Sequence, residues 1–89
     1  MASVRLDAML KEFVPKRTLT TSAPTVREAI EELERRYPKV RWRLRDETGA
    51  MRRYVKVFVN GEAVSGTKAL STRLAPDDTI DILHSIQGG

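Results

Sequence analysis

Few side chains of this 89-residue chain could carry out a reaction by themselves. His84 is the one histidine and cysteine is absent. A histidine cluster or a thiolate metal site therefore cannot be built, and a catalytic triad would depend on His84 alone. Gly49, Gly61 and Gly66 stand alone in separate turns, whereas a phosphate-binding loop brings its glycines together. We interpret His84 as a surface residue, and we predict a protein that is not an enzyme, has no metal site and holds no cofactor permanently.

The end of the chain offers a different reactive group. Ile86 and Gln87 are followed by Gly88 and Gly89. Glycine has no Cβ and adopts both signs of φ, so two glycines form a thin and flexible segment. We predict that residues 87–89 are a flexible tail that holds the Gly89 carboxylate away from the folded body. The alternative is a terminus without function or a remnant of cloning.

Composition and charge limit the classes of protein to consider. Hydrophobic residues make up 40% of the chain, which is enough for the modest core of one small domain. Sixteen Lys and Arg stand against twelve Asp and Glu, giving a net charge of +4 that fits a nucleic-acid partner and ordinary solubility equally well. No apolar run approaches the length of a membrane helix. We predict a cytoplasmic protein.

The first part of the sequence predicts two strands of the domain that would present the tail. Val4 and Leu6 alternate with polar residues, which is typical of a half-buried strand. Apolar residues then fall at helical spacing up to Phe13, which predicts a short helical turn that ends at Pro15. Residues 17–21 are rich in threonine and predict a second strand.

The clearest helix follows. Thr25 and Glu28 form a capping-box signature, with Thr25 as the N-cap. Residues 26–37 place apolar side chains on one face and charged ones elsewhere, as expected of a helix that packs on a core. Pro38 disfavours helical backbone at the residue before it and predicts the end of the helix.

The next stretch, residues 39–53, is basic and irregular. Arginines alternate with apolar residues from 40 to 45, around Trp42, which is typical of a short, exposed edge strand. Residues 46–49 predict a turn. A basic run with one tryptophan could also bind RNA by charge and stacking, the less favoured interpretation.

The last part of the chain predicts three strands. Residues 54–59 alternate, with valines on one face and Lys56 and Phe58 on the other. Asn60-Gly61 then predicts a two-residue hairpin with positive φ that leads into residues 62–64. Asp77 and Asp78 are interpreted as turn formers before a final strand at residues 79–86.

This order of elements predicts an α+β fold in which a mixed sheet of four to five strands packs on one main helix. Two hairpins joined through the helix, with the last strand inserted centrally, form a β-grasp. Residues 1–86 would be a single β-grasp domain and residues 87–89 its tail. The predicted core contains Val4, Leu6, Ile30, Leu33, Val57, Val59, Ile80 and Ile82.

These features together resemble the ubiquitin-like MoaD/ThiS family of sulfur carriers. The resemblance rests on the β-grasp order, on the stretches at residues 57–62 and 74–80, and on the terminal Gly88-Gly89, and it covers nearly the whole chain. The long segment between helix and third strand is closer to the MoaD and CysO side of the family than to the shorter ThiS proteins. The family commonly has Gly-Asp where this chain has Asp77-Asp78, and often a proline where His84 stands.

The resemblance implies a function. A MoeB/ThiF-like enzyme would use ATP to adenylate the Gly89 carboxylate, and a sulfur donor would convert the adenylate into a thiocarboxylate. That group would give its sulfur to a synthase of molybdopterin, cysteine, thiamine or secondary-metabolite biosynthesis. The carrier contributes the carboxylate. Gly88 and Gly89 have no side chains that would obstruct a narrow channel, and Gln87 and Ile86 complete the tail and its root.

A partner would also need a surface to recognise. Phe58 and Leu83 are large apolar residues on the face opposite the core, and exposed apolar patches mark interfaces. Lys56, Arg52 and Arg53 would form a polar rim. The alternative is that a second layer, such as the segment around Trp42, folds over Phe58 and Leu83.

Two other functions compete with sulfur transfer. The first is a ubiquitin-like modifier whose Gly89 is joined to lysines of target proteins. The second is an RNA-binding module that uses residues 41–53, which we regard as unlikely. No membrane partner is expected.

Overall fold

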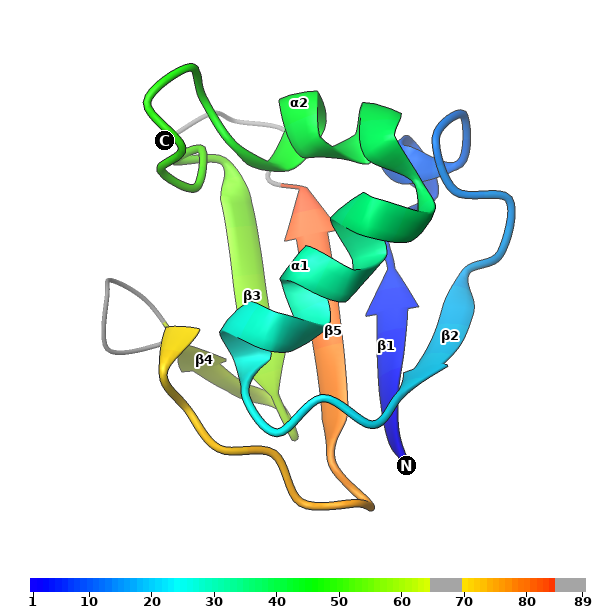
Figure 1. The fold of residues 1–89 in the computed structure, drawn as a ribbon, viewed down its shortest axis with the longest axis vertical. Helices are drawn as coiled ribbons and strands as arrows, with labels where there is room; N and C mark the ends of the chain where they lie inside the picture. Colours follow the sequence, from blue (N-terminus) through cyan, green and yellow to red (C-terminus); the bar gives the residue numbers. More distant parts are fainter. Residues whose placement is uncertain (65–69, 85–89) are drawn as a thin grey trace.

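A computed structural model describes residues 1–64 and 70–84 of the chain. Its regular elements are arranged as one sheet with helices on one side (Figure 1). The strands are β1 (Ala2–Leu6), β2 (Thr18–Thr21), β3 (Val55–Val59), β4 (Glu62–Val64) and β5 (Thr79–His84). The helices are α1 (Val26–Arg36) and α2 (Arg41–Leu44), with 3₁₀ turns η1 (Ala8–Leu10) and η2 (Pro38–Val40).

The sheet has five strands in the order β2-β1-β5-β3-β4. Strand β5 lies in the centre, parallel to β1 and antiparallel to β3. The two outer pairs, β1–β2 and β3–β4, are antiparallel. This is the predicted β-grasp, with the last strand inserted between two hairpins. The tail and Ile86 lie outside the described residues, as does the loop expected at residues 65–67.

Helix α1 forms where the sequence predicts it. The Thr25 hydroxyl accepts a hydrogen bond from the Glu28 N–H at 3.2 Å, which satisfies one of the free amides of the first turn. Val26, Ala29, Ile30 and Leu33 are all buried. The helix ends at Arg36, just before Tyr37 and Pro38, as the steric effect of a proline on the preceding residue predicts.

The core lies between α1 and the sheet, and seven of its eight predicted members are buried. Val59 is the exception, since it is only partly buried and packs against the edge of the core. It is the last residue of β3 and adjoins the exposed hairpin at Asn60 and Gly61. Both turn residues have positive φ, at 52° and 85°, as predicted.

The edge strand predicted within residues 39–53 is wrong. Residues 38–44 form η2 and α2 instead. Val40 and Leu44 are both fully buried and stand four residues apart, which is the spacing of one helical face. Trp42 between them is 63% exposed. The alternation of arginine with apolar residues therefore hid a helical period.

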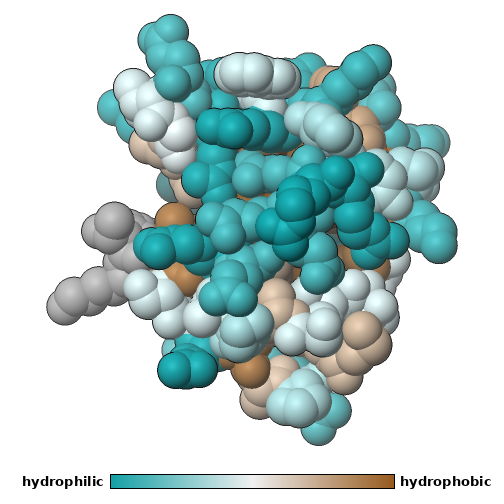
Figure 2. Space-filling model, in the orientation of Figure 1, coloured by the Kyte–Doolittle hydropathy of each residue, from teal (hydrophilic) through white to brown (hydrophobic). Residues whose placement is uncertain are grey.

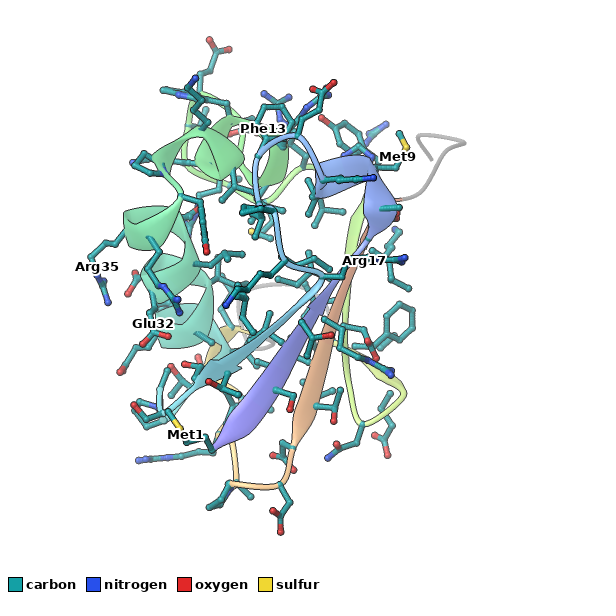
Figure 3. The ribbon with its side chains drawn as sticks, turned by 90° about the vertical axis from the view of Figure 1, so that its right-hand side faces the viewer. Met1, Met9, Phe13, Arg17, Glu32 and Arg35 are labelled. Carbon is teal, nitrogen blue, oxygen red and sulfur yellow. The ribbon has the colours of Figure 1, made fainter. Side chains whose placement is uncertain are left out.

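The two faces of the sheet are covered unequally. Helices α1 and α2 lie on one side, and in the described part of the chain no helix covers the other (Figure 3). The surface over α1 is largely hydrophilic (Figure 2). We name the uncovered side the open face. Among the described residues no helix is long and apolar enough to span a membrane.

Candidate functional site

The open face brings together three of the five predicted interface residues. Lys56 and Leu83 are partners in the register of β3 and β5, and Phe58 is the partner of Asp81. Leu83 is 42% exposed, and Phe58 is partly buried. Trp42 does not cover them, because α2 packs on the helical side of the sheet (Figure 1). The second layer considered from the sequence is therefore absent over the described part of this face.

An ion pair that sequence reasoning missed crosses the same face. Arg5 on β1 donates from Nε and Nη2 to the two carboxylate oxygens of Asp81 on β5, at 2.6 and 3.0 Å. The hydrogen bond to Asp81 and the attraction between the charges raise the pKa of the Arg5 guanidinium. The two residues are opposite each other in the parallel register. Asp81 thus lies between Phe58 and Arg5, so the apolar patch has a charged boundary on its β1 side.

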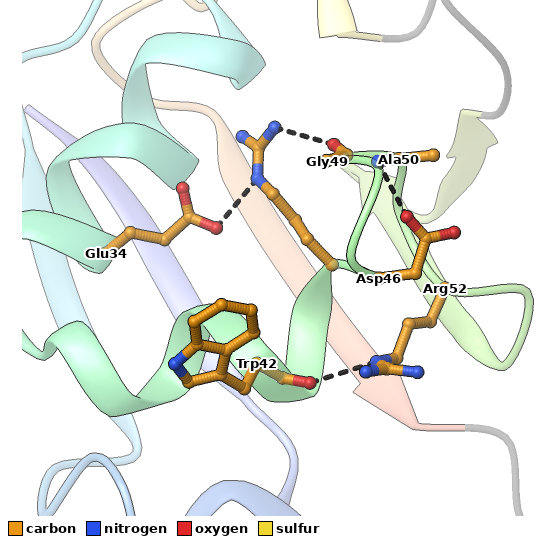
Figure 4. Close-up of polar contacts among 7 residues, drawn as sticks. Glu34, Trp42, Asp46, Gly49, Ala50 and Arg52 are labelled. Carbon is orange, nitrogen blue, oxygen red and sulfur yellow. Dashed lines mark hydrogen bonds and ion pairs between the residues drawn. The ribbon is translucent and has the colours of Figure 1, made fainter.

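Arg52, another predicted interface residue, forms hydrogen bonds elsewhere. Its Nε donates to the Trp42 carbonyl at 2.9 Å (Figure 4), and its backbone N–H donates to the Leu44 carbonyl at 2.9 Å. Both bonds attach Arg52 to α2. Its role as a polar rim beside Phe58 and Leu83 stays a prediction, as does that of exposed Arg53.

The arginine-rich segment is largely organised by its own contacts. Arg45 donates from Nε to Glu34 at 2.8 Å and from Nη1 to the Gly49 carbonyl at 3.1 Å (Figure 4). Asp46 accepts N–H bonds from Thr48 and Ala50 at 2.8 and 3.2 Å. The hydrogen bonds from Thr48 are the main reason that the pKa of Asp46 is lowered. The predicted turn at residues 46–49 is therefore present, and Arg45 ties it to α1.

His84 is the last described residue of β5, and it is not the surface residue that was predicted. The side chain is partly buried, and its Nε2 is buried without a hydrogen-bond partner in the described structure. The ring meets Tyr54 edge to face, with centroids 4.5 Å apart. Tyr54 adjoins Val55, the register partner of His84, and this explains the burial.

Asp7 holds the backbone at His84. Its Oδ2 accepts the His84 N–H at 2.8 Å, and its Oδ1 accepts the Met9 N–H at 3.0 Å as the N-cap of η1. The N–H groups of Met9 and His84 lower the pKa of the Asp7 carboxyl. Sequence reasoning had assigned Asp7 no role, since 77 positions separate it from His84.

The described residues contain no cluster of three His, Cys, Asp or Glu side chains that could hold a metal ion. They also form the open face, and they end at His84, which five residues follow in the sequence. Gly88, Gly89, Gln87 and Ile86 lie outside the described residues, so the structure does not place the predicted reactive group.

Comparisons with known proteins agree with this geometry. The model of the ThiS family matches residues 4–89. The sulfur carrier protein CysO of Mycobacterium tuberculosis is 32% identical over 76 residues, which are 83% of this chain and 82% of that protein.

Solved structures show the same fold. The crystal structure of the BexX/CysO complex of Amycolatopsis orientalis matches with a TM-score of 0.85 and 27% identity, over 100% of both chains. SAMP1 of Haloferax volcanii matches with a TM-score of 0.80 and 25% identity, over 99% of this chain and 98% of that one. The β-grasp and the predicted resemblance are confirmed, and the chain belongs to the ThiS family.

Proposed function

We propose that this protein is a sulfur carrier whose Gly89 carboxylate becomes a thiocarboxylate. The observation that carries the proposal is the match of the ThiS family model through residue 89, together with 32% identity to a sulfur carrier protein, CysO. The fold supports it, because β5 runs through the centre of the sheet and leads into the final glycines.

The chemistry requires a partner enzyme. A carboxylate is a poor electrophile because its charge is delocalised and it has no good leaving group. A MoeB/ThiF-like enzyme would join the Gly89 carboxylate to the α-phosphate of ATP and release pyrophosphate. A sulfur donor would then displace AMP from the acyl carbon, and the resulting thiocarboxylate would pass its sulfur to an acceptor synthase. ATP is consumed by the partner in the cytoplasm, and the carrier needs no cofactor of its own.

The open face is the surface that we assign to the partner enzymes. Leu83 and Phe58 supply apolar area, and Lys56 adds a positive charge beside Leu83. Leu83 is one residue from His84, so a protein bound here would lie next to the departure point of the tail. The similarity to CysO in a complex with BexX supports binding to a protein partner.

Intact-mass measurement tests the proposal. The protein is incubated with a ThiF-like adenylating enzyme, ATP and a sulfur donor. The expected result is a mass gain equal to the exchange of one oxygen for one sulfur. A variant that lacks Gly88 and Gly89 should show no gain while unfolding at the same temperature as the full chain. A truncated protein that still gains the mass would contradict the proposal.

A protein modifier is the second candidate function. The similarity to SAMP1, a small archaeal modifier protein, favours it. In this case Gly89 would form isopeptide bonds with lysines, and a series of heavier species would appear on target proteins. Such a series in cells, without the sulfur-exchanged form of the free protein, would favour the modifier over the carrier.

A further inference from the structure

We infer that Asp7 is a positioning residue that fixes the origin of the C-terminal tail by substituting its side chain for a missing backbone acceptor. The inference rests on the proposed function, because it concerns how the Gly89 carboxylate is presented. It begins from the hydrogen-bond pattern between β1 and β5.

In the parallel ladder β1 bonds to β5 through alternate residues. Ser3 N–H donates to the Asp78 carbonyl at 2.9 Å, and Asp7 N–H donates to the Ile82 carbonyl at 3.0 Å. A regular parallel ladder would continue with the His84 N–H donating to the Asp7 carbonyl. That carbonyl is turned into η1, where it accepts the Leu10 N–H at 2.9 Å.

The Asp7 carboxylate takes the place of its own carbonyl. Oδ2 accepts the His84 N–H at 2.8 Å, so the ladder gains one more bond after β1 has ended at Leu6. An ionised carboxylate has several acceptor positions, and Oδ1 remains available to cap η1 at Met9. The Asp7 side chain, directly after the end of β1, therefore caps η1 and accepts a hydrogen bond from the last residue of β5.

Strand β3 does not provide a second hydrogen-bond acceptor for the His84 N–H. Hydrogen-bonded pairs alternate along an antiparallel ladder, and Asn60 N–H donates to the Thr79 carbonyl at 2.8 Å. By that alternation the pair Lys56–Leu83 carries bonds and the pair Val55–His84 does not. The Val55 N–H donates instead to the Arg52 carbonyl at 3.0 Å. The His84 N–H therefore points toward Asp7.

The position of His84 matters because only five residues separate it from the end of the sequence. Releasing the His84 N–H would leave Leu83 as the last residue of β5 bonded in the ladder, which is one residue, or about 3.3–3.6 Å of extended chain, further from Gly89. A carboxylate on a longer free segment occupies the reaction centre of a docked partner for a smaller fraction of the time. The open face would still bind.

Two matched variants test the inference. Asp7→Ser keeps an N-cap for η1, but a single hydroxyl cannot serve both Met9 and His84. Asp78→Ser removes a carboxylate of similar function at the opposite end of β5, where it accepts the Ala75 N–H at 2.7 Å and the Asn60 Nδ2 at 2.8 Å. Amide exchange at His84 is measured by NMR, and kcat and KM are measured with the adenylating enzyme as carrier concentration is varied.

In Asp7→Ser, protection of the His84 amide should fall about tenfold, as expected for loss of a hydrogen bond to a charged group. The chain between the last bonded residue of β5 and Gly89 becomes one residue longer, which should lower kcat by about a quarter, with KM little changed. Asp78→Ser should alter neither quantity. His84 exchange that is equal in the two variants overturns the inference, and so does faster exchange with kcat unchanged. If the wild-type protein is not adenylated, the proposed function fails, while the exchange data still decide whether Asp7 fixes His84.

Discussion

An aspartate side chain accepts hydrogen bonds at each end of β5. The two aspartates differ in how far along the sequence their bonding partners lie. At the start, the Asp78 carboxylate accepts bonds from Ala75 and Asn60, and Asn60 Oδ1 accepts the Thr79 N–H at 2.9 Å. These partners are turn residues within 19 positions of each other. At the end, His84 depends on Asp7, 77 positions away.

The comparison shows which contacts hold His84, the last described residue before the predicted tail. The start of β5 is organised by its own turn and by the neighbouring hairpin. Both ends pair with β1, since the Ser3 N–H donates to the Asp78 carbonyl at the start. The end differs because its side-chain bond also comes from beyond β1, where Asp7 accepts the His84 N–H. A partner enzyme that recognises the root of the tail therefore recognises the folded sheet as well.

The largest expected effect is the loss of stability caused by core substitutions in β5. This loss should be similar near the start and near the end of the strand. Ile80 and Ile82 are both buried, at 0% and 1% exposure. Replacing either by alanine should lower the free energy of unfolding by about 2–5 kcal/mol, measured by urea denaturation. A much smaller loss for Ile82→Ala than for Ile80→Ala would mean that the tail end of β5 is poorly packed, contrary to the structure.

Asn60 tests the start of β5. Its φ of 52° is left-handed, which costs a residue with a Cβ about 1–2 kcal/mol unless a local hydrogen bond compensates. Asn60→Gly removes the side-chain bonds but tolerates this backbone, whereas Asn60→Ala loses both. We expect alanine to be about 1 kcal/mol less stable than glycine at this position. Neither variant should change His84 exchange; a change would show that the two ends are coupled.

The start of β5 could be predicted from the sequence because its signals are local. Asn60-Gly61 predicted the hairpin, Asp77 and Asp78 predicted the turn, and alternation placed Ile80 and Ile82 inside. The same alternation placed Phe58 and Leu83 together on the open face. A period of two is readable from one strand alone.

The contacts at the end of β5 could not be predicted, because no short pattern records which residues of two neighbouring strands become partners. The bonds from His84 to Asp7 and from Arg5 to Asp81 both depend on the register of β1 and β5. The burial of His84 against Tyr54 depends on the register of β3 and β5. Helix α2 was missed for a different reason: over five residues, alternating arginines fit a strand as well as a single helical turn.

A substitution at Leu83 tests docking of the partner enzyme separately from the positioning of His84 by Asp7. Leu83→Ser should raise the KM of the adenylating enzyme about tenfold, as expected for truncating an apolar interface residue, and leave kcat nearly unchanged. Stability should change by no more than about 0.5 kcal/mol, since the side chain is on the surface. Trp42→Ser, which removes a 63% exposed apolar side chain on the other side of the sheet, is the control. An equal rise in KM for both variants would remove the open face as the docking surface.

The smallest expected effect is a dependence of stability on pH that both ends share. The pKa values of Asp7 and Asp78 lie below the ordinary value of 3.8, each because of hydrogen bonds from backbone N–H groups, with Asn60 adding to the effect at Asp78. A lowered pKa in the folded state means that the stabilisation is complete above the unfolded pKa and is lost as pH falls through the folded one. The wild-type protein should therefore lose stability below about pH 3.8, and its advantage over Asp7→Ser and over Asp78→Ser should shrink there. Thermal unfolding across this range measures both differences. If the gap for Asp7→Ser stayed constant while the gap for Asp78→Ser closed, the Asp7 carboxylate would not be the group that holds His84.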